Sequence, residues 1–197
     1  MRNPISDRSD PRAVRSQQRA IDAALDLIRE VGAGRVTIES IAARSGVAKT
    51  TLYRQFDDLE SLLFAAFESL KRPQQIPTEH GVVADIERWL LDFAASLFSD
   101  EFAALIPAMI EVAERTDRGR VLAREFAARR RVAMQTRLQQ AIDEHELPAD
   151  IDIDTIVSML VGPLFYRRFI SRQTAPPDFV RQLVVSALAS LVVTSAT

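Results

Sequence analysis

The sequence predicts an all-α protein with an N-terminal three-helix helix-turn-helix domain and a larger C-terminal helical domain. Apolar residues recur at steps of three and four along almost the whole chain, which is the spacing of amphipathic helices. No segment alternates apolar and polar residues with the period of two that is typical of a half-buried strand. Pro73 and Pro77 interrupt the helical pattern and indicate a boundary.

The first part of the chain predicts four helices. Residues 1–11 are polar, include two prolines and predict a flexible arm. An amphipathic helix is expected from residue 12 to 31, ended by Gly32 and Gly34. Thr37 is a suitable N-cap for a short helix that stops at Gly46, and further helices are expected over 49–56 and 59–70. We therefore expect a helix-turn-helix domain over 12–58 and a helical body over 59–197.

The body predicts five more helices, over approximately 82–99, 101–115, 118–146, 154–171 and 178–194. Pro107 is expected to kink or break the second of these, because proline removes a helical hydrogen bond. The Gly162-Pro163 pair is expected to cause a local break in the fourth.

Charge is distributed unevenly along the 197 residues. The net charge is −2, but residues 1–56 hold ten basic and six acidic side chains, whereas the remainder holds 15 and 21. A basic head on an acidic body is typical of a DNA-binding module joined to a module that does not bind DNA, although random scatter is an alternative interpretation.

Composition also limits the other classes of protein. The absence of cysteine excludes disulfides and thiolate metal sites, and two distant histidines lack the spacing of metal ligands. We expect no cofactor and no metal. The N-terminus resembles no signal peptide, and the strongly apolar stretch 183–193 is too short to span a bilayer, so we expect a cytoplasmic protein without a membrane partner.

The segment 36–63 has the chemistry of a nucleic-acid reader. Two short helices share a small core, and Leu52 and Phe56 pin the second helix by a single face. Gly46 lies where the chain must turn sharply. The other face is left with groups that bond phosphates and base edges: Lys49, Thr50, Thr51, Tyr53, Arg54 and Gln55. A solvated helical hairpin is the alternative interpretation.

The same segment resembles the tetracycline-repressor (TetR) family over residues 12–70. The resemblance is carried by Thr37, Ile41-Ala42, Ala43, Gly46-Val47, Thr51-Leu52-Tyr53, Phe56 and Glu60-Ser61-Leu62. It implies that Lys49 and Thr50 read base edges, while Thr51, Tyr53 and Arg54 contact phosphates or bases. It also implies that Gln55, where the family often has a phosphate-binding histidine, and the helix capped by Thr37 contact phosphates. Leu59 departs from the pattern, because the family usually has a phosphate-binding lysine there.

The resemblance implies a palindromic double-stranded DNA operator, a homodimer and a small-molecule effector. Helices apolar on more than one face need two partners, so we expect a dimer interface at Val157, Leu160, Leu164, Phe179, Leu183, Val184, Leu188 and Leu191. A larger monomer core is the alternative. In the C-terminal ligand-binding and dimerisation domain that the resemblance implies, an apolar ligand pocket is expected, and plain helical core is the alternative interpretation of the same residues. The expected lining residues are Phe67, Trp89, Phe93, Leu105, Met109, Phe126, Met134 and Tyr166.

The sequence therefore predicts a sequence-specific DNA-binding transcriptional regulator, a repressor that a small apolar ligand releases. An enzyme is not expected, because no Gly-rich phosphate loop, nucleophile elbow or paired catalytic cluster is present. A helical ligand-binding or scaffold protein without DNA binding is the alternative, and Leu59 is the residue that supports it.

Overall fold

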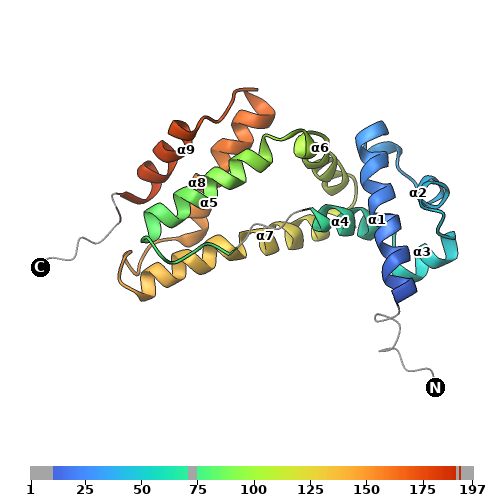
Figure 1. The fold of residues 1–197 in the computed structure, drawn as a ribbon, viewed down its shortest axis with the longest axis horizontal. Helices are drawn as coiled ribbons and strands as arrows, with labels where there is room; N and C mark the ends of the chain where they lie inside the picture. The colour runs from blue at the N-terminus through green and yellow to red at the C-terminus, as the bar shows by residue number, and fades with distance from the viewer. Residues whose placement is uncertain (1–10, 71–74, 190, 192–197) are drawn as a thin grey trace, which may run out of the picture. The chain divides into compact units, whose positions relative to one another are not determined.

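The computed structural model describes residues 11–70, 75–189 and 191, and every regular element among them is helical (Figure 1). This confirms the all-α prediction. The expected arm falls almost entirely on residues outside this range, as does Pro73. The elements are α1 (Pro11–Val31), the 3-10 turn η1 (Ala33–Arg35), α2 (Ile38–Ser45), α3 (Lys49–Gln55), α4 (Leu59–Ser69), α5 (Val82–Leu97), α6 (Asp100–Arg115), α7 (Asp117–Asp143), α8 (Ile153–Phe165), the π-helical turn η2 (Tyr166–Ile170), α9 (Pro177–Val184) and the π-helical turn η3 (Val185–Ala189).

Two internal prolines, Pro107 and Pro163, do not break their helices: the break expected at Gly162-Pro163 is absent, and of the kink or break expected at Pro107 the break is absent. Pro107 lies inside α6 and Pro163 inside α8, and both helices continue across them. After Pro163 the helix changes type instead: at the end of η2 the Ser171 N–H donates to the Tyr166 carbonyl, five residues earlier, at 2.9 Å. Wide π-turns of this kind accommodate an irregular hydrogen-bond ladder without ending the helix.

The chain forms two compact units. Unit 1 comprises Met1–Arg72 and Ala104–Ala127, and unit 2 comprises Pro73–Ala103 and Ala128–Thr197. The division differs from the predicted ranges 12–58 and 59–197, because α4 packs extensively on α1 and the segment 104–127 also joins unit 1. Helices α6 and α7 each contribute residues to both units.

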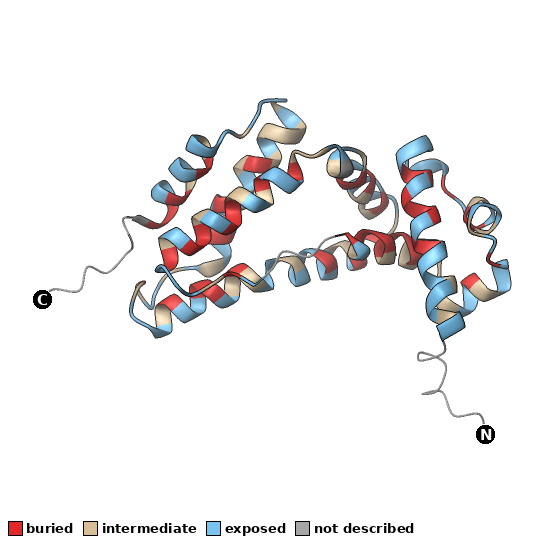
Figure 2. Cartoon of the chain, viewed as in Figure 1, coloured by how far each residue is buried: buried red, intermediate tan, exposed pale blue. Residues whose placement is uncertain are grey.

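The core of unit 1 forms where α1 meets α2 and α4. Ala20, Ala24 and Ile28 on α1 are almost fully buried, as are Leu62 and Phe67 on α4. Figure 2 shows buried stretches along both helices. The Phe64 ring makes edge contacts with Phe67 at 5.5 Å and Phe126 at 6.3 Å between centroids. Burying each large apolar side chain contributes about 1.5–3 kcal/mol, so this core holds α1, α2 and α4 together.

Unit 2 is built from α5, the C-terminal part of α7, α8 and α9. Helix α5 contacts both α8 and α9 and carries a nearly continuous buried face (Figure 2). Leu90, Leu138, Leu160 and Val184 are completely buried, one from each helix. Each of the four helices therefore contributes a completely buried apolar side chain to the core of unit 2.

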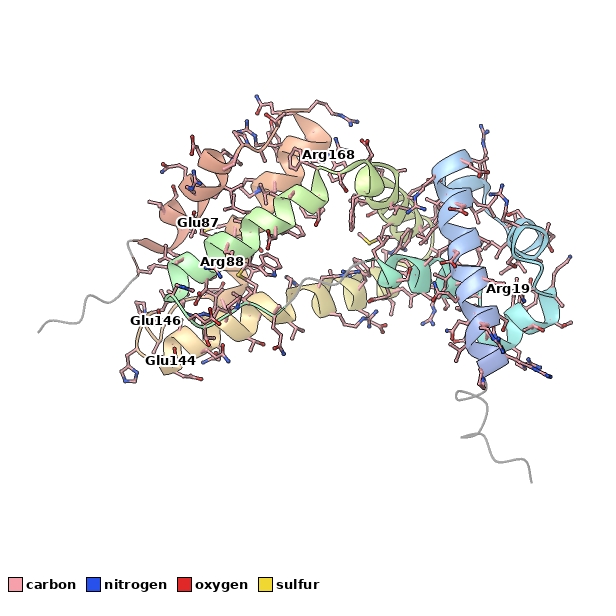
Figure 3. All side chains as sticks on the ribbon, viewed as in Figure 1. Arg19, Glu87, Arg88, Glu144, Glu146 and Arg168 are labelled. Carbon is pink, nitrogen blue, oxygen red and sulfur yellow. The ribbon has the colours of Figure 1, made fainter. Side chains whose placement is uncertain are left out.

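An ionic cluster lies within the apolar core of unit 2. Arg137 and Asp85 are each 1% exposed, and the Arg137 guanidinium donates to Asp85 Oδ2 at 3.0 Å and to Glu146 Oε1 at 2.9 Å. Glu146, labelled in Figure 3, also accepts the Val82 N–H at 2.7 Å on Oε2. The cluster therefore ties the start of α5 to α7 and to the segment that follows α7.

Among the described residues, no single helix has the length and apolarity to cross a membrane; α5 and part of α6 pass that test only together, as a bent pair.

Candidate nucleic-acid interface

The turn between α2 and α3 depends on Gly46. Its φ is +66°, in the left-handed region, and its N–H donates to the Ala42 carbonyl at 3.0 Å to close α2. L-residues are disfavoured at this φ because their Cβ approaches the backbone. The chain reverses there and places Val47, 4% exposed, in the core before α3 begins.

One face of α3 is anchored and the opposite face is open. Leu52 is completely buried and Phe56, directly after the helix, is 7% exposed; both pack in a core that also buries Ile41 of α2. Lys49, Thr50, Tyr53 and Arg54 are exposed, and Thr51 is half-buried. The helix thus presents hydroxyl and cationic groups to solvent along one side.

The N-terminus of α2 is closed by a reciprocal capping box. Thr37 Oγ1 accepts the Ser40 N–H at 3.1 Å, and Ser40 Oγ accepts the Thr37 N–H at 3.0 Å. The first turn of a helix carries partial positive charge, which favours an anion such as phosphate. Thr37 therefore sets where the positive end of α2 lies.

Lys49, the first residue of α3, forms an ion pair across to α2. Its Nζ donates to Glu39 Oε1 at 2.9 Å, and both side chains are more than half exposed. The hydrogen bond from Lys49 lowers the pKa of the Glu39 carboxyl below its ordinary value. A donor and an acceptor therefore stand side by side at the start of α3.

Gln55 points away from the open face of α3. Its Nε2 donates to Ser16 Oγ at 2.6 Å and to the Ala13 carbonyl at 3.2 Å, both on α1. Its Oε1 is buried without a hydrogen bond. Gln55 thus fastens the C-terminal end of α3 to the first turns of α1.

The start of α4 is held by polar contacts within unit 1. Asp58 caps the helix by accepting the Ser61 N–H at 2.7 Å. Arg118 Nε lies 3.5 Å from Asp58 Oδ2, and its Nη2 donates to Ser61 Oγ at 3.3 Å. Partial burial works to raise the pKa of Asp58, but the bonds from Ser61 and Arg118 lower it overall.

The eight residues expected to line a ligand pocket divide equally between the units. In unit 1, Phe67, Leu105 and Phe126 are buried core residues and Met109 is half-buried. In unit 2, Trp89 and Met134 are buried, Phe93 is half-buried and Tyr166 is 58% exposed.

The residues expected at a dimer interface lie mostly inside the chain's own core. Five of the eight are buried within unit 2: Val157, Leu160, Leu164, Val184 and Leu188. Phe179, Leu183 and Leu191 are half-buried. The large apolar side chains that α8 and the two π-turns do expose are others, namely Met159, Tyr166, Ile170 and Val185. The sequence pattern did not distinguish the two faces, because both are apolar.

Two family models match the chain, and together they cover both of its parts. Residues 20–66 match the model of bacterial regulatory proteins of the tetR family. Residues 76–187, more than half of the chain, match the tetracyclin repressor-like C-terminal domain. The chain belongs to the TetR family.

Two relatives of this TetR protein are similar to it in sequence over most of its length. It is 29% identical over 197 residues to the uncharacterised HTH-type transcriptional regulator YdeS of Bacillus subtilis, covering 98% of both chains. It is 28% identical to an uncharacterised HTH-type transcriptional regulator of Mycobacterium tuberculosis, over 81% of this chain and 79% of that one. The TetR chain is therefore a DNA-binding transcriptional regulator with a helix-turn-helix.

Solved structures show the same fold. The TetR family regulator SCO0332 superposes with a TM-score of 0.70 at 25% identity, covering 90% of this chain and 99% of that one. A TetR-family regulator from Mesorhizobium loti gives 0.72 at 19% identity, over 93% and 100%. FadR from Bacillus subtilis, solved in complex with stearoyl-CoA, gives 0.67 at 19% identity, over 87% and 98%.

Some polar contacts of this TetR regulator were not found from its sequence. Lys49 bonds Glu39, ten positions away, at 2.9 Å. Arg44 makes two bonds to Glu30, fourteen positions away, at 2.8 and 2.6 Å. Sequence spacing identifies pairs within one helix, three or four residues apart, but these two pairs depend on how different helices pack. Leu59, the departure from the family pattern, is half-buried at the start of α4.

Proposed function

We propose that this TetR regulator is a cytoplasmic repressor that binds a palindromic operator as a homodimer and is released by a small apolar ligand. The observation that carries the proposal is the geometry of α3, which is buried along Leu52 and open along Lys49, Thr50 and Tyr53. A helix anchored in this way can enter the major groove with its N-terminal residues against the base edges.

Each polar residue on the open side of α3, and half-buried Thr51, receives a role from its chemistry. Lys49 and Thr50, at the N-terminus, read base edges, and Lys49 pairs with guanine O6 and N7. Thr51, Tyr53 and Arg54 bond phosphates and fix the register. Thr37 and the N-terminal turn of α2 hold a further phosphate.

Gln55 is omitted from the DNA contacts, because its amide already donates twice to α1. We assign it to holding α3 against α1. Leu59 supplies no charge for a phosphate at the start of α4, so we expect a shallower salt dependence than a lysine there would give, by about one unit per contact.

The proposed dimer interface uses the apolar side chains that α8, α9 and the two π-turns leave exposed. Met159, Tyr166, Ile170 and Val185 are 48%, 58%, 70% and 47% exposed, and half-buried Leu183 extends the patch on α9. Covering these groups with a second copy removes apolar surface from water. Two copies then place two recognition helices about 34 Å apart, as successive major grooves require.

A charge placed in this patch tests the dimer. We expect Ile170→Glu to give monomers in sedimentation equilibrium, where the wild-type protein gives dimers. Val132→Glu is the matched control, because Val132 is 54% exposed on α7, outside the patch. Dimers of the Ile170 variant, or equal loss in both variants, would contradict this interface.

The ligand is proposed to bind along an aromatic row in unit 2. Trp89 stacks on Phe93 with centroids 5.3 Å apart, Phe93 lies 6.2 Å from Phe165, and Phe165 lies 5.9 Å from Phe169. Arg168, labelled in Figure 3, has its guanidinium 5.8 Å from the Phe98 ring, and its Nε is buried without a hydrogen bond. We therefore expect an apolar ligand with an anionic or carbonyl group for Arg168.

Stearoyl-CoA is a suitable first probe, since a structural relative was solved with it. Trp89 is the single tryptophan and lies in the row, so its fluorescence reports occupancy. We expect saturable quenching by the acyl compound and none by free coenzyme A. Equal quenching of the Trp89 fluorescence by stearoyl-CoA and by free coenzyme A would contradict an apolar site.

The regulator itself is tested by binding to DNA from upstream of its own coding region, at two salt concentrations. We expect tight binding that weakens with salt, at two subunits per palindrome or a multiple of two. Weak binding that is equal on any DNA would overturn the operator proposal.

A further inference from the structure

The ion pair between Lys49 and Glu39 stands at the DNA-facing end of α3. The pair joins the first residue of α3 to the first turn of α2, with Nζ and Oε1 2.9 Å apart. Its side chains are 54% and 62% exposed, so both are available to a ligand. A carboxylate at this place is unexpected on electrostatic grounds alone, because DNA phosphates repel it.

The carboxylate limits what Lys49 does on arbitrary DNA. Non-specific binding comes almost entirely from cationic groups that neutralise phosphates and release counterions. While Lys49 is paired with Glu39, its charge is already compensated, as the lowered pKa of Glu39 reflects. Moving Lys49 to a phosphate would leave Glu39 unpaired close to the negatively charged backbone, so the pair disfavours binding to DNA without the correct bases.

On the correct bases the same pair is complementary to the groove. A G·C pair presents the guanine O6 and N7 acceptors beside the cytosine N4 donor in the major groove. The Lys49 ammonium donates and the Glu39 carboxylate accepts, so together they match both halves of that pattern. A·T pairs present a different order of groups, with a methyl group at thymine.

We propose that Glu39 is a specificity-determining residue, which reads a G·C pair together with Lys49 and restrains Lys49 from phosphates elsewhere. The inference rests on the proposed role of α3 as the recognition helix. It assigns to α2 a base-reading side chain in addition to its phosphate-binding N-terminus.

The test compares Glu39→Gln with wild type on two duplexes of equal length. One carries the site that wild-type protein enriches from a random library, and the other has random sequence. We expect the variant to bind random DNA several-fold more tightly, with a salt slope steeper by about one unit for each freed lysine. We expect its preference for the enriched site over random DNA to fall about tenfold, as loss of a base contact does.

Glu30→Gln is the matched control. Glu30 is also exposed, lies in the same domain and is paired, but with Arg44 at the other end of α2. The Glu30→Gln substitution removes one negative charge, as Glu39→Gln does, but leaves the Lys49 ion pair intact. An equal rise in random-DNA affinity from both variants would show a net-charge effect and overturn the role of Glu39.

A second comparison, in protein that already lacks the Lys49 ammonium, tests whether Glu39 acts through Lys49. In Lys49→Met protein, we expect Glu39→Gln to leave the random-DNA salt slope unchanged, because no ammonium remains to be freed. A slope that still rises would contradict the coupling. Failure of wild-type protein to enrich any sequence would count against the proposed operator binding and overturn base reading by Glu39, while the random-DNA comparison still decides whether Glu39 restrains Lys49 from phosphates.

Discussion

Opposite charges meet in two very different settings in this molecule. In the helix-turn-helix region the pairs Glu30–Arg44 and Glu39–Lys49 stand in solvent, with all four side chains between 40% and 62% exposed. In unit 2, Arg137 and Asp85 are paired at 1% exposure inside an apolar core.

The setting decides what a pair does. Exposed pairs are screened by water and salt, contribute little to stability and exchange partners easily. Buried pairs cannot be separated without leaving a charge in a poorly solvated place. The surface pairs are therefore suited to a binding face that must release its cations to DNA, and the buried cluster is suited to fixing the start of α5.

Breaking the buried cluster is the change with the largest expected effect. Arg137→Met removes the cation and leaves Asp85 buried without its partner, so we expect a loss of about 3–5 kcal/mol of unfolding free energy. Urea denaturation followed by Trp89 fluorescence measures it, because Trp89 lies on α5 in the same unit.

The double variant Asp85→Leu/Arg137→Met sharpens that result. It removes both fully buried charges and leaves only Glu146, which is 27% exposed. We expect it to recover much of the lost stability, since replacing a buried ion pair with apolar groups is often neutral. An Arg137→Met protein as stable as wild type would show that Asp85 does not need its buried partner.

Gly46→Ala is expected to have the next largest effect. Alanine at φ +66° costs about 1–2 kcal/mol, because the left-handed region crowds its Cβ. The urea midpoint followed by circular dichroism measures the change. Gly162→Ala is the control, since Gly162 lies within α8 and no atom lies within 4 Å of an added Cβ. Equal destabilisation of both would contradict the conformational explanation.

Thr37→Ala should cost about 1 kcal/mol, because it removes the oxygen that caps α2. Thr37→Ser keeps that oxygen and should remain near wild-type stability. The same denaturation experiment compares them, and an unchanged midpoint for the alanine variant would show that Ser40 closes the helix unaided.

Glu30→Gln should have the smallest effect, because its pair with Arg44 is open to solvent. The hydrogen bond from Arg44 lowers the pKa of Glu30 in the folded protein. A depressed carboxyl pKa stabilises the fold above the unfolded pKa, near 4.3, and that contribution disappears as pH falls through the folded value. We therefore expect any difference between variant and wild type at pH 7 to vanish under more acidic conditions. A difference that grows on acidification would reverse the sign of this linkage.

The helices of this protein could be predicted because apolar spacing and capping residues are local signals. Thr37, Gly46 and Asp58 each act within a few residues, and each cap or turn is found where the sequence places it. Pro163 shows the limit of local rules, because α8 continues past it into a π-turn.

The long-range contacts could not be predicted in the same way. Val184 and Val185 are adjacent and chemically identical, yet one is completely buried and the other is 47% exposed. Gln55 has the polarity of a DNA-binding side chain, but its amide is directed to α1 across some forty residues of chain. Packing between helices decides both cases, and periodicity within one helix does not contain that information.

The affinity of Lys49→Ala for DNA from upstream of the coding region tests most directly whether the open face of α3 reads DNA. A bidentate base contact is worth about 1–3 kcal/mol, so we expect a loss of about fivefold to about 150-fold against wild type on the specific site. We expect a much smaller loss on random DNA. Wild-type affinity of the variant on the specific site would contradict the assignment of α3 as the recognition helix.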